Sequence, residues 1–184
     1  MGLGPSVPAE SSRRDPPSCS ALNFPPPLSA FAEVVPLFRI IKVLPCVVLD
    51  TNVFVSALRS RRGASFRLLE LVGTGRFEIE LSVPLALEYE SVGRRVLPNT
   101  TVTEPAFEAI LNYVCRSARH REVFFSWRPC LPDPGDDLVL ELAVAAGGAS
   151  IVTFNVSDFR GAERFGVRVL RPLEFLAEIG EGRA

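Results

Sequence analysis

The hydrophobic pattern of the chain follows two periods from Cys46 onward. Runs that are apolar on consecutive or alternate residues predict β-strands, and apolar residues three or four positions apart predict helices. The predicted strands are residues 47–49, 77–81, 122–125, 150–153 and 167–170. The predicted helices are residues 52–58, 65–72, 85–95, 103–119, 138–146 and 172–179, with a loop and a short helix in 155–165. This repeated strand-then-helix order predicts an α/β fold, a three-layer α/β/α sandwich with a mainly parallel central sheet.

Residues 1–42 differ from the rest of the chain in composition. Half of the 16 prolines lie there, among serine and other small residues. Because proline removes a backbone donor and blocks helix formation, we expect a Pro-rich, disordered N-terminal extension over 1–42, followed by one ordered domain over 43–180. A binding segment for another protein is an alternative, as is translation that starts near Val43.

The overall charge and the cysteines argue against several classes of protein. The formal net charge is −1 at pH 7, so no global positive field attracts nucleic acid or an anionic membrane. The four cysteines follow no paired spacing such as C-x-x-C, which argues against a zinc site or a disulfide framework. The chain also lacks the run of about 20 apolar residues that spans a bilayer. We therefore expect a cytoplasmic protein with reduced thiols and no membrane contact.

Acidic side chains recur where predicted strands end or the following helices begin. Asp50 follows the first strand directly, and Asp158 follows the fourth. Glu88 lies early in the third helix, and Asp136 and Asp137 lie at the start of the buried helix. Right-handed crossovers bring the carboxyl ends of parallel strands to one edge of the sheet, so we expect these acids to converge in one crevice. For Asp50, capping of the following helix is an equally simple explanation.

This acidic constellation predicts a divalent metal ion. Several carboxylates in one crevice repel one another and take up protons unless a cation neutralises them. An oxygen-only ligand set fits Mg²⁺ or Mn²⁺. A metal-held water has a lowered pKa and attacks a phosphodiester at neutral pH, so the constellation predicts hydrolysis without a histidine. The one histidine, His120, lies among arginines and is expected at the surface.

The chain resembles the PIN-domain ribonucleases, the family of VapC-type toxins and 5′-nuclease relatives. The resemblance covers about residues 46–178 and is carried by five segments: VLDTNV at 48–53, LEY at 87–89, DPGDDLVLELA at 133–143, IVTFNVSDF at 151–159 and VLRPLEF at 169–175. Any one of these motifs alone is weak, but acidic motifs in this order and at these separations are specific.

The resemblance implies roles for the residues that match the family's motifs. Asp50, Glu88 and Asp137 correspond to the three core acids that hold the metal and catalyse, with Asp158 as the fourth. Asp136 replaces Asp137 as ligand if the helix starts one residue later. The residues implied to support the acids from neighbouring positions are Thr51, Asn52, Thr153 and Asn155. Many relatives carry a second Asp at the position of Asn155, so the resemblance does not decide whether a second metal ion binds. The remaining acids nearby are expected to face solvent, namely Glu90 and Asp133.

The resemblance also implies an activity and partners. It implies a divalent-metal-dependent endoribonuclease that hydrolyses RNA phosphodiester bonds and, by family analogy, the toxin of a toxin–antitoxin pair. The implied partners are an RNA substrate, a cognate antitoxin protein and a second copy of the chain in a homodimer. An RNA-processing nuclease without an antitoxin, and a non-catalytic PIN-like module that binds RNA or protein, are the alternatives. We expect Arg59, Arg61 and Arg62 to contact RNA phosphates, with a solvated loop as the other interpretation.

Overall fold

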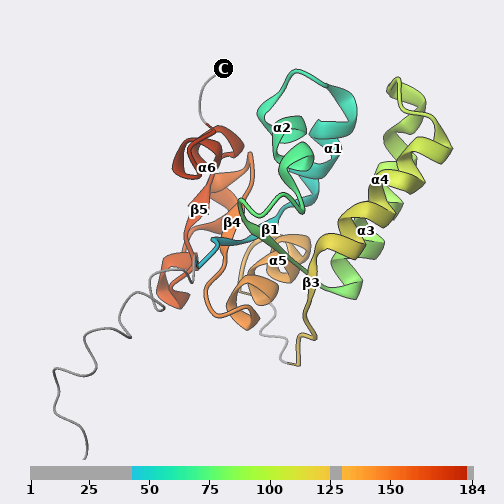
Figure 1. Cartoon of the computed structure of the whole chain (residues 1–184). Coiled ribbons are helices and arrows are strands. Elements are labelled where there is room, and N and C mark those ends of the chain that lie inside the picture. The colour runs from blue at the N-terminus through green and yellow to red at the C-terminus, as the bar shows by residue number, and fades with distance from the viewer. Residues whose placement is uncertain (1–42, 125–129, 182–184) are drawn as a thin grey trace, which may run out of the picture. The chain divides into compact units, whose positions relative to one another are not determined.

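The predicted three-layer architecture is confirmed by the structure, a computed structural model that describes residues 43–124 and 130–181 (Figure 1). A five-stranded sheet has the order β3-β2-β1-β4-β5, and its neighbouring strands all pair in parallel. The extension predicted over residues 1–42 lies outside the described residues. Among the residues that the structure describes, no helix has the length and apolar character needed to cross a lipid bilayer.

The elements alternate along the chain as the hydrophobic pattern predicts. The strands are β1 (Cys46–Leu49), β2 (Glu78–Leu81), β3 (Arg119–His120), β4 (Ser150–Val152) and β5 (Val169–Leu170). The α-helices are α1 (Thr51–Arg59), α2 (Ala64–Leu71), α3 (Val83–Val96), α4 (Glu104–Ser117), α5 (Pro134–Ala145) and α6 (Pro172–Glu178). Short 3₁₀ helices are η3 (Leu97–Asn99), η4 (Val156–Phe159) and η5 (Ala162–Phe165).

One predicted strand is wrong. The strand expected at residues 122–125 is replaced by β3 at Arg119–His120, and residues 121–124 form no strand. Charge pairs accompany this edge strand: Arg119 Nη1 lies 2.6 Å from Glu78 Oε2, and Arg121 Nε lies 2.8 Å from Glu80 Oε2. Both partners belong to β2, so ion pairs accompany the pairing of β3 with β2, and a hydrophobic pattern does not reveal them.

Helix α5 begins well before residue 138, where the pattern predicts it. Asp133 caps the helix, since its Oδ1 accepts a hydrogen bond from Gly135 N at 2.8 Å. Pro134 occupies the first turn, where its missing N–H has no partner to lose. The early start places Asp136 and Asp137 inside the first turn and so controls the direction of each carboxylate.

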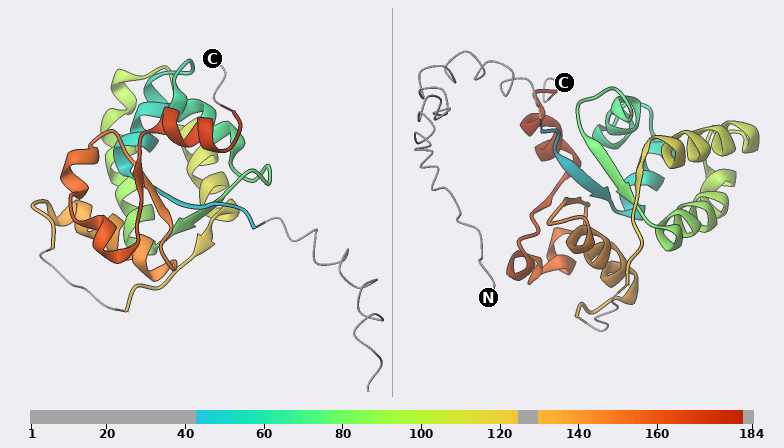
Figure 2. Two further views of the ribbon diagram at one scale, coloured as in Figure 1. Left: turned by 90° about the vertical axis from the view of Figure 1, so that its left-hand side faces the viewer. Right: turned by 60° about the horizontal axis from the view of Figure 1, so that its bottom comes forward.

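The central strand β1 separates two hydrophobic clusters. Successive side chains of a strand point to opposite faces, so Val47 and Leu49 join one cluster and Val48 joins the other. Residues of α1, α2 and α6 complete the first cluster, and residues of α1, α3, α4 and α5 complete the second (Figures 1 and 2). The side chains of Val47, Val48 and Leu49 are essentially inaccessible to solvent, as expected for the middle strand of a parallel sheet.

Tyr89 fastens α3 to the end of β1. Its buried ring stacks on Phe54 with the ring centroids 4.5 Å apart and the planes 7° from parallel. Its hydroxyl donates a hydrogen bond to the carbonyl oxygen of Leu49, so the one polar atom of this buried side chain has a partner. This contact holds the second turn of α3 beside the carboxyl end of β1 and places Glu88 near Asp50.

Helices α3 and α4 pack closely at Gly93, where an added Cβ would collide with the fully buried ring of Phe107. Gly93→Ala would gain about 1 kcal/mol of helix propensity, but displacing a packed ring costs about 1–3 kcal/mol. We expect the variant to lose about 1 kcal/mol of unfolding free energy, measured by urea denaturation. Ser91→Ala on the exposed face of α3 is the control, with a change within about 0.5 kcal/mol. Equal stability of the two variants would show that the ring relaxes freely.

Candidate active site

Asp50 lies between β1 and α1 and is almost completely buried, with 7% of its surface exposed. Its Oδ1 accepts a hydrogen bond from Asn52 N at 3.3 Å and so caps α1. Its Oδ2 accepts from Asn52 Nδ2 at 2.7 Å and from Thr153 Oγ1 at 2.6 Å. Burial raises the pKa of Asp50, while these hydrogen bonds lower it and the charge of Asp158 raises it further. Asp50 is therefore a helix cap as well as a member of an acidic site.

Thr153 joins the ends of β1 and β4 through a closed hydrogen-bond network. Its buried hydroxyl donates to Asp50 and accepts from Asn52 Nδ2 at 3.0 Å and from Asn155 N at 2.9 Å. The other end of the Asn52 amide accepts from Phe154 N at 3.2 Å. The hydroxyl thus uses its donor and both acceptor positions, and the amide uses both of its donors, which fixes the direction of the Asp50 carboxylate.

Glu88 lies half-buried on α3, next in sequence to the anchoring Tyr89. Burial raises the pKa of Glu88, the nearby Thr51 hydroxyl lowers it, and the charges of Asp50 and Asp133 raise it again. Thr51 Oγ1 is buried and has no partner at normal hydrogen-bonding geometry. This hydroxyl therefore lies close enough to influence the carboxylate without forming a full hydrogen bond, and it is a polar atom with bonding capacity to spare.

Negative charge concentrates at Asp136 in the first turn of α5. Its pKa is raised to about 6, first by burial and then by the charges of other carboxylates. Those carboxylates, in order of effect, are Asp50, Asp133, Asp158 and Glu88. We call these five residues the acidic cluster. The strand ends and helix starts of four separate segments supply it, as the crossover rule predicts.

The carboxylate of Asp137 binds backbone N–H groups of the segment before α5. Only 2% of its surface is exposed, and its Oδ1 accepts a hydrogen bond from Leu131 N at 2.8 Å. Cys130 N donates to both oxygens, at 3.2 Å and 3.3 Å. Asp137 thereby anchors the chain that enters α5, whereas the neighbouring Asp136 is the residue whose charge couples to the other acids.

The three arginines predicted to contact RNA are distant from these acids along α1. Asp50 caps the start of this helix and Arg59 is its last residue. Nine helical residues span about 13 Å at 1.5 Å per residue. Arg61 and Arg62 follow in the turn before α2 and line a hollow shared with α2 and α6. The structure does not bring this basic turn next to the acidic cluster.

Two residues of the site escape the sequence pattern. Asp133, expected to face solvent, is exposed, but its charge acts on both Glu88 and Asp136. The Asp-Pro pair before α5 was the available signal, because it marks a helix cap followed by a first-turn proline. Tyr89 positions Glu88 through the Leu49 carbonyl, and no local pattern indicates a contact between residues so far apart in sequence.

The carboxylates of the acidic cluster interact electrostatically, but they do not form a complete metal-binding site. As the side chains stand, no three His, Cys, Asp or Glu residues within 43–124 and 130–181 are grouped closely enough to hold a metal ion. Their charges nevertheless act on Asp136 together, because Coulomb interactions extend further than coordination bonds. Side-chain rotation is therefore needed before several of these carboxylates can share one cation.

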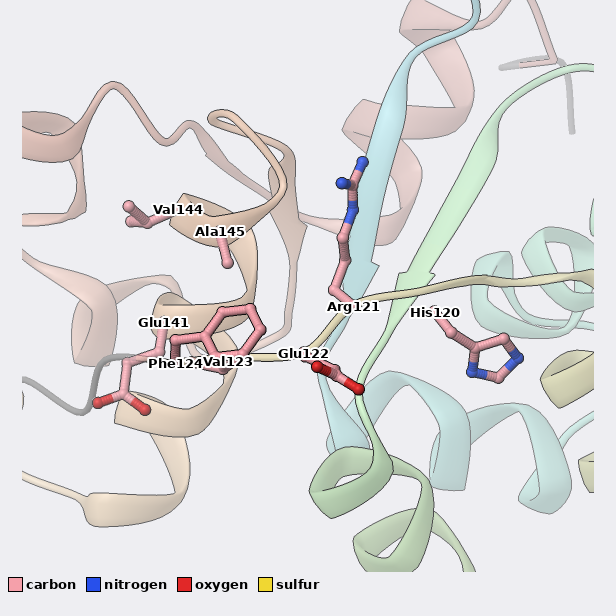
Figure 3. Close-up of a pocket in the computed structure, with 8 residues that line it drawn as sticks. All are labelled: His120, Arg121, Glu122, Val123, Phe124, Glu141, Val144 and Ala145. Atoms are coloured by element: carbon pink, nitrogen blue, oxygen red, sulfur yellow. The ribbon is translucent and has the colours of Figure 1, made fainter.

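A separate hollow of about 530 Å³ lies between α5 and the segment that follows β3 (Figure 3). Its described lining is His120 to Phe124 together with Glu141, Val144 and Ala145, and includes no member of the acidic cluster. Figure 3 shows the imidazole of His120 turned away from α5. The ring nitrogen Nε2 lies 2.8 Å from the carbonyl oxygen of Cys115, and His120 is exposed. Neither the hollow nor the histidine belongs to the acidic cluster.

Comparison with known proteins identifies the family. The crystal structure of VapBC2 from Rickettsia felis bound to a DNA fragment from their promoter is similar, with a TM-score of 0.46 and 15% identity over 67% of this chain and 96% of that one. No curated protein matches the chain. The model of the PIN domain matches residues 46–157, which is more than half of the chain and includes Asp50, Glu88 and Asp136. The chain therefore belongs to the PIN domain family.

Proposed function

We propose that the chain is a divalent-metal-dependent endoribonuclease that hydrolyses RNA phosphodiester bonds at the acidic cluster. The observation that carries this proposal is that burial, and then the charges of four other carboxylates, raise the pKa of Asp136 to about 6. Like charges held together in a partly desolvated place destabilise the folded state, so stability alone does not favour this arrangement. A bound cation would remove the repulsion, and PIN family membership supports the same reading.

The residues present fit a hard divalent cation, Mg²⁺ or Mn²⁺. The cluster offers only carboxylate oxygens, the donors that these ions prefer, and the unpartnered Thr51 hydroxyl adds another oxygen. The residues proposed to hold the ion are Asp50, Glu88, Asp136 and Asp158. When bound, such an ion supplies a water of lowered pKa and neutralises charge on the phosphoryl group.

In this proposal, other residues of the chain hold the metal-binding carboxylates in position. Thr153 and Asn52 hold the Asp50 carboxylate in one orientation, so this charge is in place before substrate arrives. Asp136 takes the role of third core acid that the family resemblance assigns to Asp137. Asp137 instead holds the backbone before α5, which keeps the first turn of the helix, and hence Asp136, in position.

The cellular role is proposed from family analogy alone. We propose that the nuclease is the toxin of a toxin–antitoxin pair, held inactive by a cognate antitoxin. Expression of the chain should then arrest growth, and co-expression of a small neighbouring gene should relieve the arrest. A chain that cleaves RNA but arrests growth under no condition would instead be an RNA-processing nuclease.

Asparagine substitutions separate the two adjacent aspartates. Asp136→Asn should reduce Mg²⁺-dependent cleavage of single-stranded RNA on the order of 100-fold or more, because it removes a charge from the cation site. Asp137→Asn should lower the unfolding free energy by about 1–3 kcal/mol, because the bonds from Leu131 N and Cys130 N lose their charged acceptor. Cleavage by the folded fraction of Asp137→Asn should persist.

Cleavage with Mg²⁺ and with EDTA, together with urea denaturation, measures both effects. Loss of cleavage in Asp137→Asn at unchanged stability, with Asp136→Asn fully active, would reverse the assignment. A wild-type chain that binds RNA but leaves it intact with every divalent ion would establish the non-catalytic binding module in place of the nuclease.

The raised pKa of Asp136 predicts a pH dependence of stability in the metal-free chain. The pKa of an aspartate in the unfolded chain is about 3.9, whereas the pKa of the folded Asp136 carboxyl is about 6. The folded state therefore binds the extra proton in this window, and stability falls as pH rises from about 4 through 6. In EDTA, the melting temperature of the wild type relative to Asp136→Asn should decrease between pH 5 and pH 7. Adding Mg²⁺ at pH 7 should restore it. Parallel melting curves at all pH values would refute the coupling.

A further inference from the structure

A small hollow beside the acidic cluster is lined by two arginines that the sequence pattern did not single out. Its volume is about 120 Å³, and Arg160 and Arg164 line it together with Leu131 and Leu140. Arg160 directly follows η4 and Arg164 lies in η5. The hollow therefore lies between the segment that enters α5, α5 itself and the 3₁₀ turns that follow β4.

Short connections join this hollow to the acids on both sides. Asp158, whose charge acts on Asp50 and Asp136, precedes Arg160 by only two residues in the same turn. On the other side, Leu131 donates its backbone N–H to Asp137, the residue next to Asp136. The hollow is therefore formed by the same two segments that carry Asp158 and Asp136.

Both arginines are exposed and available. Among the described residues, neither takes part in an ion pair, whereas other arginines of the chain such as Arg67, Arg121 and Arg168 do. Glu163 lies between the two in sequence, but its Oε2 accepts a hydrogen bond from Gly161 N at 3.0 Å. Two unpaired positive groups around one hollow repel each other and favour an anion between them.

The small volume of the hollow and the two guanidinium groups that line it suit a phosphate group. The planar guanidinium fork donates two parallel hydrogen bonds to a phosphate or carboxylate. Pockets for whole small molecules measure about 300–1,000 Å³, so this hollow suits a single phosphate group better than a nucleoside. We propose that Arg160 and Arg164 bind a backbone phosphate of the RNA strand that flanks the scissile phosphate. This inference rests on the proposed function and assigns the cleaved molecule to strands that carry a phosphate beyond the scissile one.

Binding to a fluorescent single-stranded RNA 12-mer tests the inference directly. The full chain with Asp136→Asn keeps the RNA intact, and fluorescence anisotropy at several salt concentrations gives the affinity and its salt dependence. Adding Arg160→Ala and Arg164→Ala should weaken binding on the order of tenfold, as expected for the loss of charged hydrogen bonds worth about 1.5 kcal/mol. The slope of log K against log salt should fall by about 0.7, the value for one phosphate of a single strand.

Arg116→Ala is the matched control, because this arginine is also exposed and lies in the last turn of α4. Its affinity and slope should equal those of the parent. Unchanged affinity and slope in the double variant, or the same loss in Arg116→Ala, would overturn the inference.

Kinetics with the otherwise wild-type chain distinguish this inference from the proposed function. The double variant should raise KM for the 12-mer on the order of tenfold at unchanged kcat. Its kcat/KM for a dinucleoside monophosphate, which has no flanking phosphate, should not change. Equal loss on both substrates would overturn the inference while Mg²⁺-dependent cleavage still supported the nuclease. Failure of the wild type to cleave with any divalent ion would overturn the proposed function itself.

Discussion

A buried carboxylate at the end of the central strand is the constraint on which the rest of the structure depends. An ionised group that is almost fully removed from water costs several kcal/mol unless it is hydrogen-bonded. Asp50 meets this requirement with donors from α1 and from Thr153, the residue that follows β4. The bonds that keep the charge therefore also start a helix and join two neighbouring strands. Fold and site share the same atoms at this edge of the sheet.

The opposite side of the acidic cluster is positioned by apolar packing. Glu88 has its place because Tyr89 is stacked on Phe54 and bonded to the last carbonyl of β1. Farther along α3, Gly93 accepts the ring of Phe107, which keeps α4 close to the helix. A carboxylate held by its neighbour's packing can be partly exposed and still well placed. Polar bonds position Asp50, and a hydrophobic anchor positions Glu88.

The sequence predicts well what depends on local pattern. Period-two and helical spacing identify the order of the elements, and the break after β1 marks Asp50 as a residue at a strand end. The choice between Asp136 and Asp137 is different, because consecutive helical residues point about 100° apart. The proposed choice rests on the hydrogen bond from Leu131 N to Asp137, a contact with a segment that has no regular structure. No periodicity contains this information.

The hydrophobic pattern also does not indicate features that depend on charge. Strand β3 was misplaced because ion pairs with β2, not apolar residues, accompany its register. Arg160 and Arg164 gave no signal, since nearly all of the 20 basic residues of the chain are arginines and no pair of them stands out by composition. These two arginines differ from the others in lining a hollow next to the turn that carries Asp158, and neither takes part in an ion pair among the described residues.

The hydrogen bonds of Asp50 make its two oxygens chemically unequal. Oδ2 already receives two short donors, at 2.6 Å and 2.7 Å, and has no lone pair left for another ligand. Oδ1 receives a single long bond of 3.3 Å from a backbone N–H. Asp50 can therefore offer one oxygen and not a chelating pair. Under the proposed function, such monodentate ligation would suit the small octahedral Mg²⁺ better than Ca²⁺, whose larger shell readily accepts carboxylates through both atoms.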